Sequence, residues 1–165
     1  MLKIYTSIQG LDFGQLMAVY AQSNLENALE LYPHEESNVA IMRVEQDFYC
    51  FLKEDFFETQ GAFYAVWEHN GRYVSALRME PYRDGNLLEA LETAPAQRRK
   101  GYAKALIKAV TSYLREQSNR KVYSHVNKKN HASLKAHEAC GFNRILEYAV
   151  YIDGSVMQNS CTLQY

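Results

Sequence analysis

The sequence is poor in the features that mark several large classes of protein. It has only three cysteines, Cys50, Cys140 and Cys161, and they lack the C-x-x-C spacing of many zinc and redox sites. Histidines lie near Cys140, but the paired ligands that zinc requires are missing. An odd, scattered set of cysteines is typical of free thiols in a reducing compartment. We therefore expect no metal site and a cytoplasmic protein.

An excess of one charge and long apolar runs are also lacking. The chain has 18 lysines and arginines against 19 aspartates and glutamates, which gives a net charge of −1. A dedicated nucleic-acid binder would be basic over its whole domain. No segment approaches the roughly 18 apolar residues of a membrane span, and the first residues lack the basic region and apolar core of a signal peptide. We expect neither nucleic acid nor a membrane as a partner.

What the chain contains is sufficient for one α/β domain over residues 1–165. Its length is that of a single domain, and 47% of its residues are hydrophobic. No internal repeat, linker or low-complexity segment interrupts it. Apolar residues at helical spacing predict helices over about 12–33, 37–56, 99–117 and 132–140. Strand patterns cover about 2–6, 62–68, 73–80, 87–93, 121–126, 145–152 and 156–163.

Turn signals arrange these strands into a mixed sheet. Asn70-Gly71 and Asp84-Gly85 predict tight turns, so the strands between residues 62 and 93 should form an antiparallel meander. The helix over 99–117 joins strand 87–93 to strand 121–126, which predicts a right-handed parallel crossover. A turn at 153–154 should close a final hairpin. The expected architecture is a twisted sheet of about seven strands with about four flanking helices.

Residues 97–103 form the most informative stretch. Arg98, Arg99 and Lys100 are three consecutive cations directly before a helix, and Gly101 allows a close approach of the backbone. A helix N-terminus adds free N–H groups and the positive end of the helix dipole, so the stretch suits a polyphosphate ligand. A solvated basic helix start is the plainer alternative. An RNA-binding patch with the lysines at 128–129 is another, which the acidic balance disfavours.

A second motif follows thirty residues later, on a short helix that a glycine ends. It reads N-x-x-S-x-x-x-H-x-x-x-G-F and consists of Asn130, Ser133, His137, Gly141 and Phe142. With the R-x-x-G-x-A of residues 98–103, this motif resembles the GNAT acetyltransferase superfamily. The acetyl-CoA signature of that superfamily is [QR]-x-x-G-x-[GA], then N-x-x-[AS]-x-x-x-Y-x-x-x-G-F. Only His137, in the tyrosine position, departs from it. The resemblance covers residues 62–152, and the earlier residues match by element order.

The resemblance implies a GNAT-like fold and acetyl-CoA as the acyl donor. The pyrophosphate would lie on the turn and helix start made of Arg98, Arg99, Lys100, Gly101, Tyr102 and Ala103. The pantetheine arm would add like a strand to strand 87–93, where that strand splays from 121–126. Its partners would be main-chain groups of Leu91, Glu92 and Thr93, one of whose N–H groups would stabilise the oxyanion. Asn130 and Ser133 would hold the arm at the start of the next helix.

Acyl transfer to an amine also needs a base and an acid. The resemblance suggests Glu89 or His125 as the base, directly or through water. It suggests His137 as the acid for the departing thiolate, in place of the usual tyrosine. Each residue has a plainer interpretation. Glu89 could be a surface carboxylate, His125 a packing histidine and His137 a residue of the helix surface.

We therefore expect an acetyl-CoA-dependent N-acetyltransferase whose acceptor is a primary amine of a small molecule or peptide. The alternative is a catalytically silent acyl-CoA-binding or regulatory module, which the substitution at His137 keeps open. Thirteen tyrosines are consistent with an aromatic pocket for an apolar or cationic group. The sequence leaves open the identity of the acceptor and whether the chain forms a homodimer.

Overall fold

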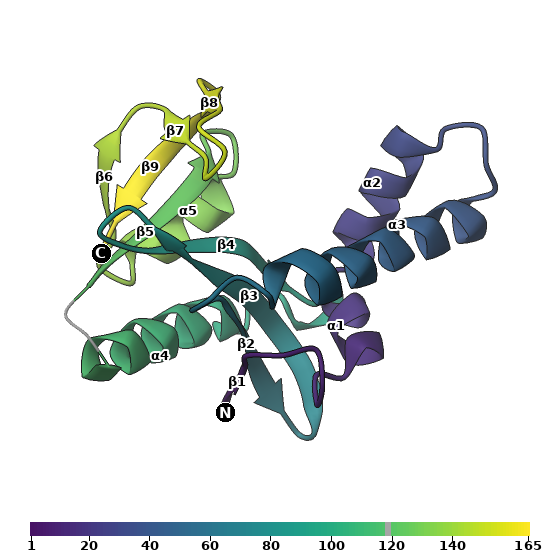
Figure 1. The fold of residues 1–165 in the computed structure, drawn as a ribbon, viewed down its shortest axis with the longest axis horizontal. Helices are drawn as coiled ribbons and strands as arrows, with labels where there is room; N and C mark the ends of the chain where they lie inside the picture. The colour runs from purple at the N-terminus through teal and green to yellow at the C-terminus, as the bar shows by residue number, and fades with distance from the viewer. Residues whose placement is uncertain (118–119) are drawn as a thin grey trace.

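The computed structural model describes residues 1–117 and 120–165, and its centre is a mixed β-sheet. The strands of this sheet are β1 (Leu2–Tyr5), β2 (Phe63–His69), β3 (Arg72–Tyr82), β4 (Gly85–Thr93), β5 (Lys121–Asn127), β6 (Asn143–Leu146) and β9 (Ser160–Gln164). They lie in the order β1-β2-β3-β4-β5-β9-β6, and the pair β4–β5 is parallel (Figure 1). The predicted α/β fold, with its seven-stranded mixed sheet, antiparallel meander and parallel crossover, is confirmed.

Helices pack on both faces of this sheet. Within the described residues the α-helices are α1 (Phe13–Val19), α2 (Ala21–Leu31), α3 (Ser37–Phe51), α4 (Tyr102–Gln117) and α5 (His131–Glu138), and the short turns are the π-helical η1 (Leu52–Phe56) and the 3-10 turn η2 (Pro95–Gln97). On one face Leu106 and Ile107 of α4 pack with Leu88 in the larger core. On the other face Leu16 of α1 and Phe56 of η1 form the second core. The sheet is thus held between α4 and α1.

The N-terminal helices differ from the prediction. The helix expected over 12–33 is two helices, because the chain turns at Tyr20, which ends α1 and begins α2. Tyr20 has φ −90° and ψ 8°, outside the helical range. The residue is buried, so core packing holds the break. As a result α2 and α3 form a pair that extends away from the sheet (Figure 1), and residues 1–117 and 120–165 contain five α-helices where about four were expected.

The expected closing hairpin, strands 145–152 and 156–163, is split into two pieces. Its tip is a separate two-stranded sheet of β7 (Ala149–Val150) and β8 (Val156–Met157). Its base joins the main sheet, where β9 lies between β5 and β6. The register of β6 with β9 shifts between Arg144 and Leu146, and the Thr162 hydroxyl donates to the Tyr148 carbonyl at 2.7 Å. The Tyr148 carbonyl, which would accept a backbone hydrogen bond in a continuous strand, therefore accepts one from a side chain instead.

The parallel strands β4 and β5 pair over a short distance and then separate. Their register runs from Gly85 opposite Lys121 to Leu88 opposite Ser124. A Cβ atom on Gly85 would overlap the Lys121 carbonyl, so glycine permits the close approach at the start of the pair. Beyond Leu88 no residue of β4 pairs with β5 in the described part of the chain. The separation opens the sheet at this point.

A β-bulge in β4 lies at the same place. Glu89 and Glu92 oppose residues of β3 that are only two apart, so Ala90 and Leu91 together stand against one residue. Ala90 has φ +50°, a left-handed conformation that is unusual for a residue with a Cβ atom. Leu91 packs with the core under α4. The bulge therefore turns Leu91 away from the face of Glu89, whereas strict alternation along the strand predicts a shared face.

Candidate active site

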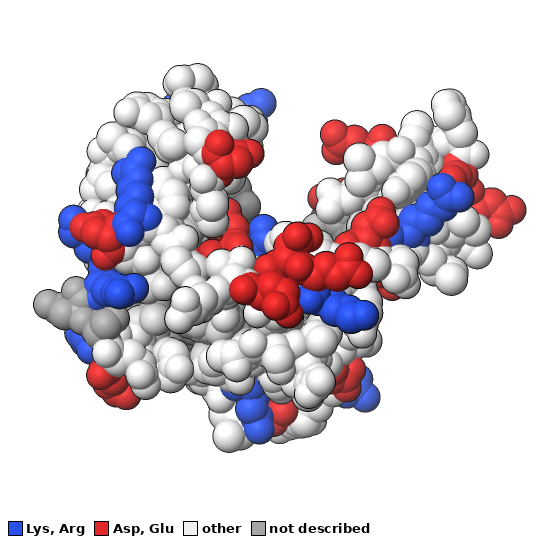
Figure 2. Space-filling view, in the orientation of Figure 1, with Lys and Arg blue, Asp and Glu red and all other residues white. Residues whose placement is uncertain are grey.

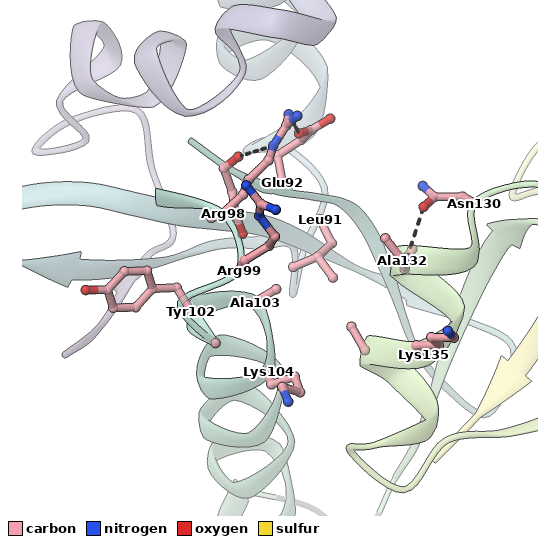
Figure 3. Close-up of a pocket in the computed structure, with 14 residues that line it drawn as sticks. Leu91, Glu92, Arg98, Arg99, Tyr102, Ala103, Lys104, Asn130, Ala132 and Lys135 are labelled. Atoms are coloured by element: carbon pink, nitrogen blue, oxygen red, sulfur yellow. Dashed lines mark hydrogen bonds and ion pairs between the residues drawn. The ribbon is translucent and has the colours of Figure 1, made fainter. Parts of the chain in front are cut away.

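A cleft of about 590 Å³ lies beside the end of β4, between the N-termini of α4 and α5 (Figure 3). Its walls are residues 91–93 of β4, the turn before α4, the first turn of α4 and the first turns of α5. Every residue predicted to bind the donor lines this cleft except Lys100. The fold thus brings the two sequence motifs onto one cavity, while their contacts with a donor stay a prediction.

The turn before α4 presents its backbone to the cleft. Arg99 and Gly101 both have positive φ, 63° and 86°, so α4 begins at Tyr102 rather than at Arg99 as expected. Nothing lies within 4 Å of the position that a Cβ atom on Gly101 would take. The first N–H groups of an α-helix have no partner within the helix. Here the residues of that first turn line the cleft, which suits an anion.

The three predicted cations have different surroundings. Arg98 turns back onto the protein, where its Nε donates to the Thr93 carbonyl at 3.1 Å and its Nη2 lies 3.5 Å from a Glu92 carboxylate oxygen. Lys100 Nζ donates to a neighbouring glutamine at 2.9 Å. Among the described residues, no side-chain hydrogen bond or ion pair engages Arg99, which lines the cleft. Of these three cations, Arg99 is therefore the one best placed for a phosphate, and Arg98 braces the end of β4.

The main chain of β4 is only partly free at the cleft. The Glu92 carbonyl accepts a hydrogen bond of 2.6 Å from the Ser75 hydroxyl, and the Thr93 carbonyl accepts from Arg98. Leu91 pairs with no residue of β3 or β5 in the register of the described strands. Of the three predicted main-chain sites, Leu91 is the one best placed to bond a ligand.

The N-terminus of α5 forms the opposite wall. Asn130 caps this helix, because its Oδ1 accepts from the Ser133 N–H at 3.0 Å (Figure 3). The side-chain NH₂ of Asn130 is therefore the part that can donate to a ligand. Ser133 lines the cleft, and its hydroxyl lies 3.3 Å from Nδ1 of His137. The two residues of the motif that were predicted to bind the donor do share this wall.

His137 lies in the core and does not line the cleft. It is 1% exposed, and its ring meets Phe142 edge-on with 5.1 Å between centroids. Nδ1 lies 2.8 Å from the Ser133 carbonyl, which can only accept, so Nδ1 carries the proton of the neutral ring. Burial lowers the pKa of His137, which favours that neutral ring. Nε2 then has no proton to donate, so the placement favours packing over the predicted acid role.

A smaller cavity of about 170 Å³ continues the cleft past the bulge. It shares Leu91, Asn130 and Ser133 with the larger cleft and adds Glu89 and His125. Both predicted bases therefore lie at one end of the cleft, next to the bulge. The molecule is also hollowed between the α2–α3 pair and the β7–β8 tip (Figure 2).

Glu89 is held by an ion pair across β3 and β4. Its Oε2 lies 3.3 Å from Arg78 Nη2, and the two side chains are 16% and 22% exposed. The Arg78 guanidinium lies 5.0 Å from the centroid of the Phe51 ring, which fixes it from the other side. Burial, together with a hydrogen bond to Glu89, raises the pKa of Glu80 to about 7. The carboxyl groups of Glu80 and Glu89 thus both lie near the guanidinium of Arg78.

His125 stands between two tyrosine rings. Tyr82 and Tyr151 meet it edge-on, with 5.4 and 5.1 Å between centroids. Among the described residues neither ring nitrogen has a hydrogen-bond partner. Burial lowers the pKa of His125, and the charge of Glu89 opposes this effect. A neutral imidazole with an unpartnered nitrogen can accept a proton or a hydrogen bond from a ligand in the cavity.

Some residues of the site lack any local sequence signal. Arg98 Nη1 donates to Gln22 of α2, and the Tyr20 hydroxyl donates to the Ala90 carbonyl at 2.7 Å. Each contact joins residues at least 70 positions apart in the sequence, so no spacing pattern predicts it. Lys104 differs, since it lines the cleft from the first turn of α4. Helical spacing from the basic turn would have identified it.

Other kinds of site are not found in residues 1–117 and 120–165. No helix there combines the length and the apolar character needed to cross a membrane, and no three potential ligands among histidine, cysteine, aspartate and glutamate cluster. Cys50, Cys140 and Cys161 are free thiols, as the sequence predicts.

Comparisons with known proteins agree with this geometry. The model of the acetyltransferase (GNAT) family matches residues 22–142. No curated protein sequence matches the chain significantly. The solved PaiA N-acetyltransferase of Thermoplasma acidophilum, in complex with coenzyme A, is similar with a TM-score of 0.66 and 12% identity over 99% of this chain and 98% of that one. A ribosomal-protein-alanine N-acetyltransferase from Brucella melitensis gives 0.63 and 16% over 100% and 98%. A spermidine N-acetyltransferase chimera, in part from Vibrio cholerae, gives 0.60 and 19% over 99% and 93%.

Proposed function

This chain belongs to the GNAT family of acetyltransferases, and we propose that it acetylates a primary amine of a small molecule or peptide with acetyl-CoA as donor. One observation carries the proposal. A helix N-terminus and a residue of β4 without a ladder partner line a cleft, and two proton acceptors line the smaller cavity that shares Leu91, Asn130 and Ser133 with it. When bound, acetyl-CoA supplies the acetyl carbon to which the new C–N bond forms while its C–S bond breaks.

The residues of the cleft fit such a donor. The first-turn N–H groups of α4 and the guanidinium of Arg99 would hold its phosphates. The main chain of Leu91 and the NH₂ group of Asn130 would hold its amide-bearing arm. The volume of about 590 Å³ lies within the range of small-molecule sites. Arg98, which lines the cleft while its guanidinium binds the end of β4, and Lys100, which does not line the cleft, would add positive charge nearby.

Two residues would move the proton of the acceptor. An alkylammonium ion has a pKa of about 10, so it must lose a proton before its nitrogen can attack. Glu89 or His125 would take that proton, since both line the cavity next to the bulge. The Leu91 N–H would donate to the acetyl oxygen as negative charge develops there. The acid role of His137 stays a prediction. If His137 does not protonate the departing thiolate, water in the open cleft would do so.

The charges around the hollow support a cationic acceptor. Carboxylate side chains gather at the base of the α2–α3 pair, over the end of α3 and η1 (Figure 2), where Glu54 and Asp55 are exposed. Glu89 lies deeper, in the cavity itself. Negative potential of this kind attracts ammonium ions. The names of two similar structures, a ribosomal-protein-alanine and a spermidine N-acetyltransferase, also describe amine acceptors.

Release of free thiol from acetyl-CoA tests the proposal. The protein would be incubated with polyamines, amino acids, aminoglycosides and short peptides, and acetyl-CoA binding would be measured in parallel by calorimetry. We expect thiol release that depends on one class of amine. Binding of acetyl-CoA without thiol release from any amine would instead favour the catalytically silent acyl-CoA-binding module.

A further inference from the structure

A chain of two tyrosine hydroxyls ends on the bulge of β4. Tyr64 Oη donates to Tyr20 Oη at 2.6 Å, and Tyr20 Oη donates to the carbonyl oxygen of Ala90 at 2.7 Å. Tyr20 is 6% exposed and Tyr64 is 0% exposed, so both hydroxyls lie in the core between α1 and the sheet. Burial raises the pKa of both tyrosines well above the ordinary value, so each hydroxyl keeps its proton and remains a donor.

The bulge depends on support of this kind. Ala90 has φ +50°, which is unfavourable for a residue with a Cβ atom, and such conformations persist only where the surroundings hold them. Neither Ala90 nor Leu91 has a partner in the described register of β3 or β5. The described register therefore gives the peptide group between them no ladder partner, and the hydroxyl of Tyr20 holds its carbonyl.

The Ala90 carbonyl and the Leu91 N–H belong to that one peptide group. In a trans peptide the two bonds point in opposite directions, and the described chain has no cis peptide. Tyr20 holds the carbonyl toward the core under α1. The N–H must then point away from that core, while Leu91 lines the cleft. A hydrogen bond to the carbonyl also polarises the N–H and makes it a stronger donor.

We propose that Tyr20 is a positioning residue for acetyl transfer, because its bond to the Ala90 carbonyl aims the Leu91 N–H at the acetyl oxygen of the donor. Tyr64 supports this role by donating to the Tyr20 hydroxyl. The inference rests on the proposed function, since the N–H acts on the bound thioester. Tyr20 lines neither the cleft nor the smaller cavity, so its effect passes through Ala90.

Tyr20→Phe removes the hydroxyl and keeps the ring in the core. We expect kcat to fall about tenfold, less than the ~10²–10³-fold loss on deleting an oxyanion donor, because the N–H remains but is less well aimed. Affinity for CoA should stay unchanged by calorimetry. Affinity for acetyl-CoA should drop toward that of CoA, since only acetyl-CoA carries the acetyl oxygen. Tyr64→Phe should lower kcat and the affinity for acetyl-CoA in the same way, but by a smaller factor.

Tyr5→Phe is the matched control. It removes one hydroxyl from another tyrosine pair, Tyr5 with Tyr73, in the same core but away from the bulge. We expect it to leave kcat and both affinities unchanged, and thermal melts would follow every variant. If Tyr20→Phe melts below the assay temperature, Tyr64→Phe carries the test.

The inference is overturned if Tyr20→Phe and Tyr64→Phe turn over like Tyr5→Phe. It is also overturned if kcat and CoA affinity fall together, because that would indicate a general loss of structure. A parent protein that releases no thiol with any amine would defeat the proposed function instead. In that case the ratio of acetyl-CoA affinity to CoA affinity still tests whether Tyr20 aims the Leu91 N–H.

Discussion

Glu89 Oε2 and Arg78 Nη2 lie 3.3 Å apart, in directly opposite residues of β4 and β3 at the edge of the bulge. The ion pair orients the carboxylate where β4 leaves β5, so it lies in the cavity and not on the outer surface. His125 lines the same cavity from β5. Two proton acceptors of different chemistry are thus set side by side at the place where an acceptor amine would meet the donor.

Glu89→Gln should lower kcat by roughly one to three decades, because the amide keeps the shape but cannot take the acceptor's proton. His125→Ala should do the same if the imidazole is the base. Neither change should weaken acetyl-CoA binding much, since both residues lie past the bulge from the turn of α4. Thiol release and calorimetry would measure the two effects separately.

The control for Glu89→Gln is Glu147→Gln. Glu147 is also paired with an arginine, at 3.3 Å from Arg144, but it is 69% exposed and lines neither cavity. We expect no change in turnover. Unchanged turnover in both Glu89→Gln and His125→Ala would show that water or the substrate itself removes the proton.

Gly101→Val should weaken acetyl-CoA binding at least tenfold. The space beside the Gly101 Cα is open, and a branched side chain there would fill the place of the phosphates and disfavour φ +86°. Gly154→Val is the matched control, because Gly154 has φ +84° and equally open surroundings in the distant turn before β8. Equal acetyl-CoA affinities of the two variants, both folded, would exclude the phosphate-binding turn.

His137→Phe and His137→Tyr distinguish packing from proton donation. If the imidazole packs, both variants should lose about 1–2 kcal/mol of stability, from a lost buried hydrogen bond and a changed volume, with kcat nearly unchanged. The acid role predicts that the tyrosine variant is active and the phenylalanine variant impaired.

The pKa of His137 is lowered from 6.5, so the parent should also lose stability below pH 6.5, where the unfolded chain takes up a proton. Urea unfolding at several pH values would measure this.

Glu80→Gln should change how stability depends on pH. The pKa of Glu80 is raised from 4.5 to about 7, so its contribution to stability is present below pH 4.5 and is lost as the pH rises through 7. A glutamine has no proton to lose. The Tm of the variant minus that of the parent should therefore increase between pH 4.5 and 7. Arg78 and Glu89 are the charged neighbours of Glu80, and a constant difference would mean that they compensate for its change in charge.

The sequence predicts those parts of the molecule that local patterns determine. Alternating strands and Asn-Gly or Asp-Gly turns predict the meander, and the crossover follows from the handedness rule. The basic turn at 98–101 and the helix cap at Asn130 are likewise local, because each acts on backbone within a few residues. These patterns were enough to predict most of the cleft lining.

The remaining features depend on contacts between distant residues. The bulge at Ala90 is supported by Tyr20, which no spacing rule connects to it. The same residue breaks the first helix, although the local sequence is helical. His137 stands at the tyrosine position of a motif, but whether its ring faces the cleft or Phe142 is decided by core packing. Local propensity carries no information on any of these choices.

The place of β9 in the sheet has a consequence for how the protein folds. β9 follows both β5 and β6 in the sequence, yet it lies between them in the sheet, and Gln164 pairs with both Tyr123 and Asn143. During synthesis β5 therefore keeps an open edge until residues 160–164 have left the ribosome. Open edges invite pairing with other chains, and long-range pairing forms slowly. The residues of the cleft are all made before the strand that closes the sheet behind them, so the nascent chain is most prone to aggregate just before β9 emerges.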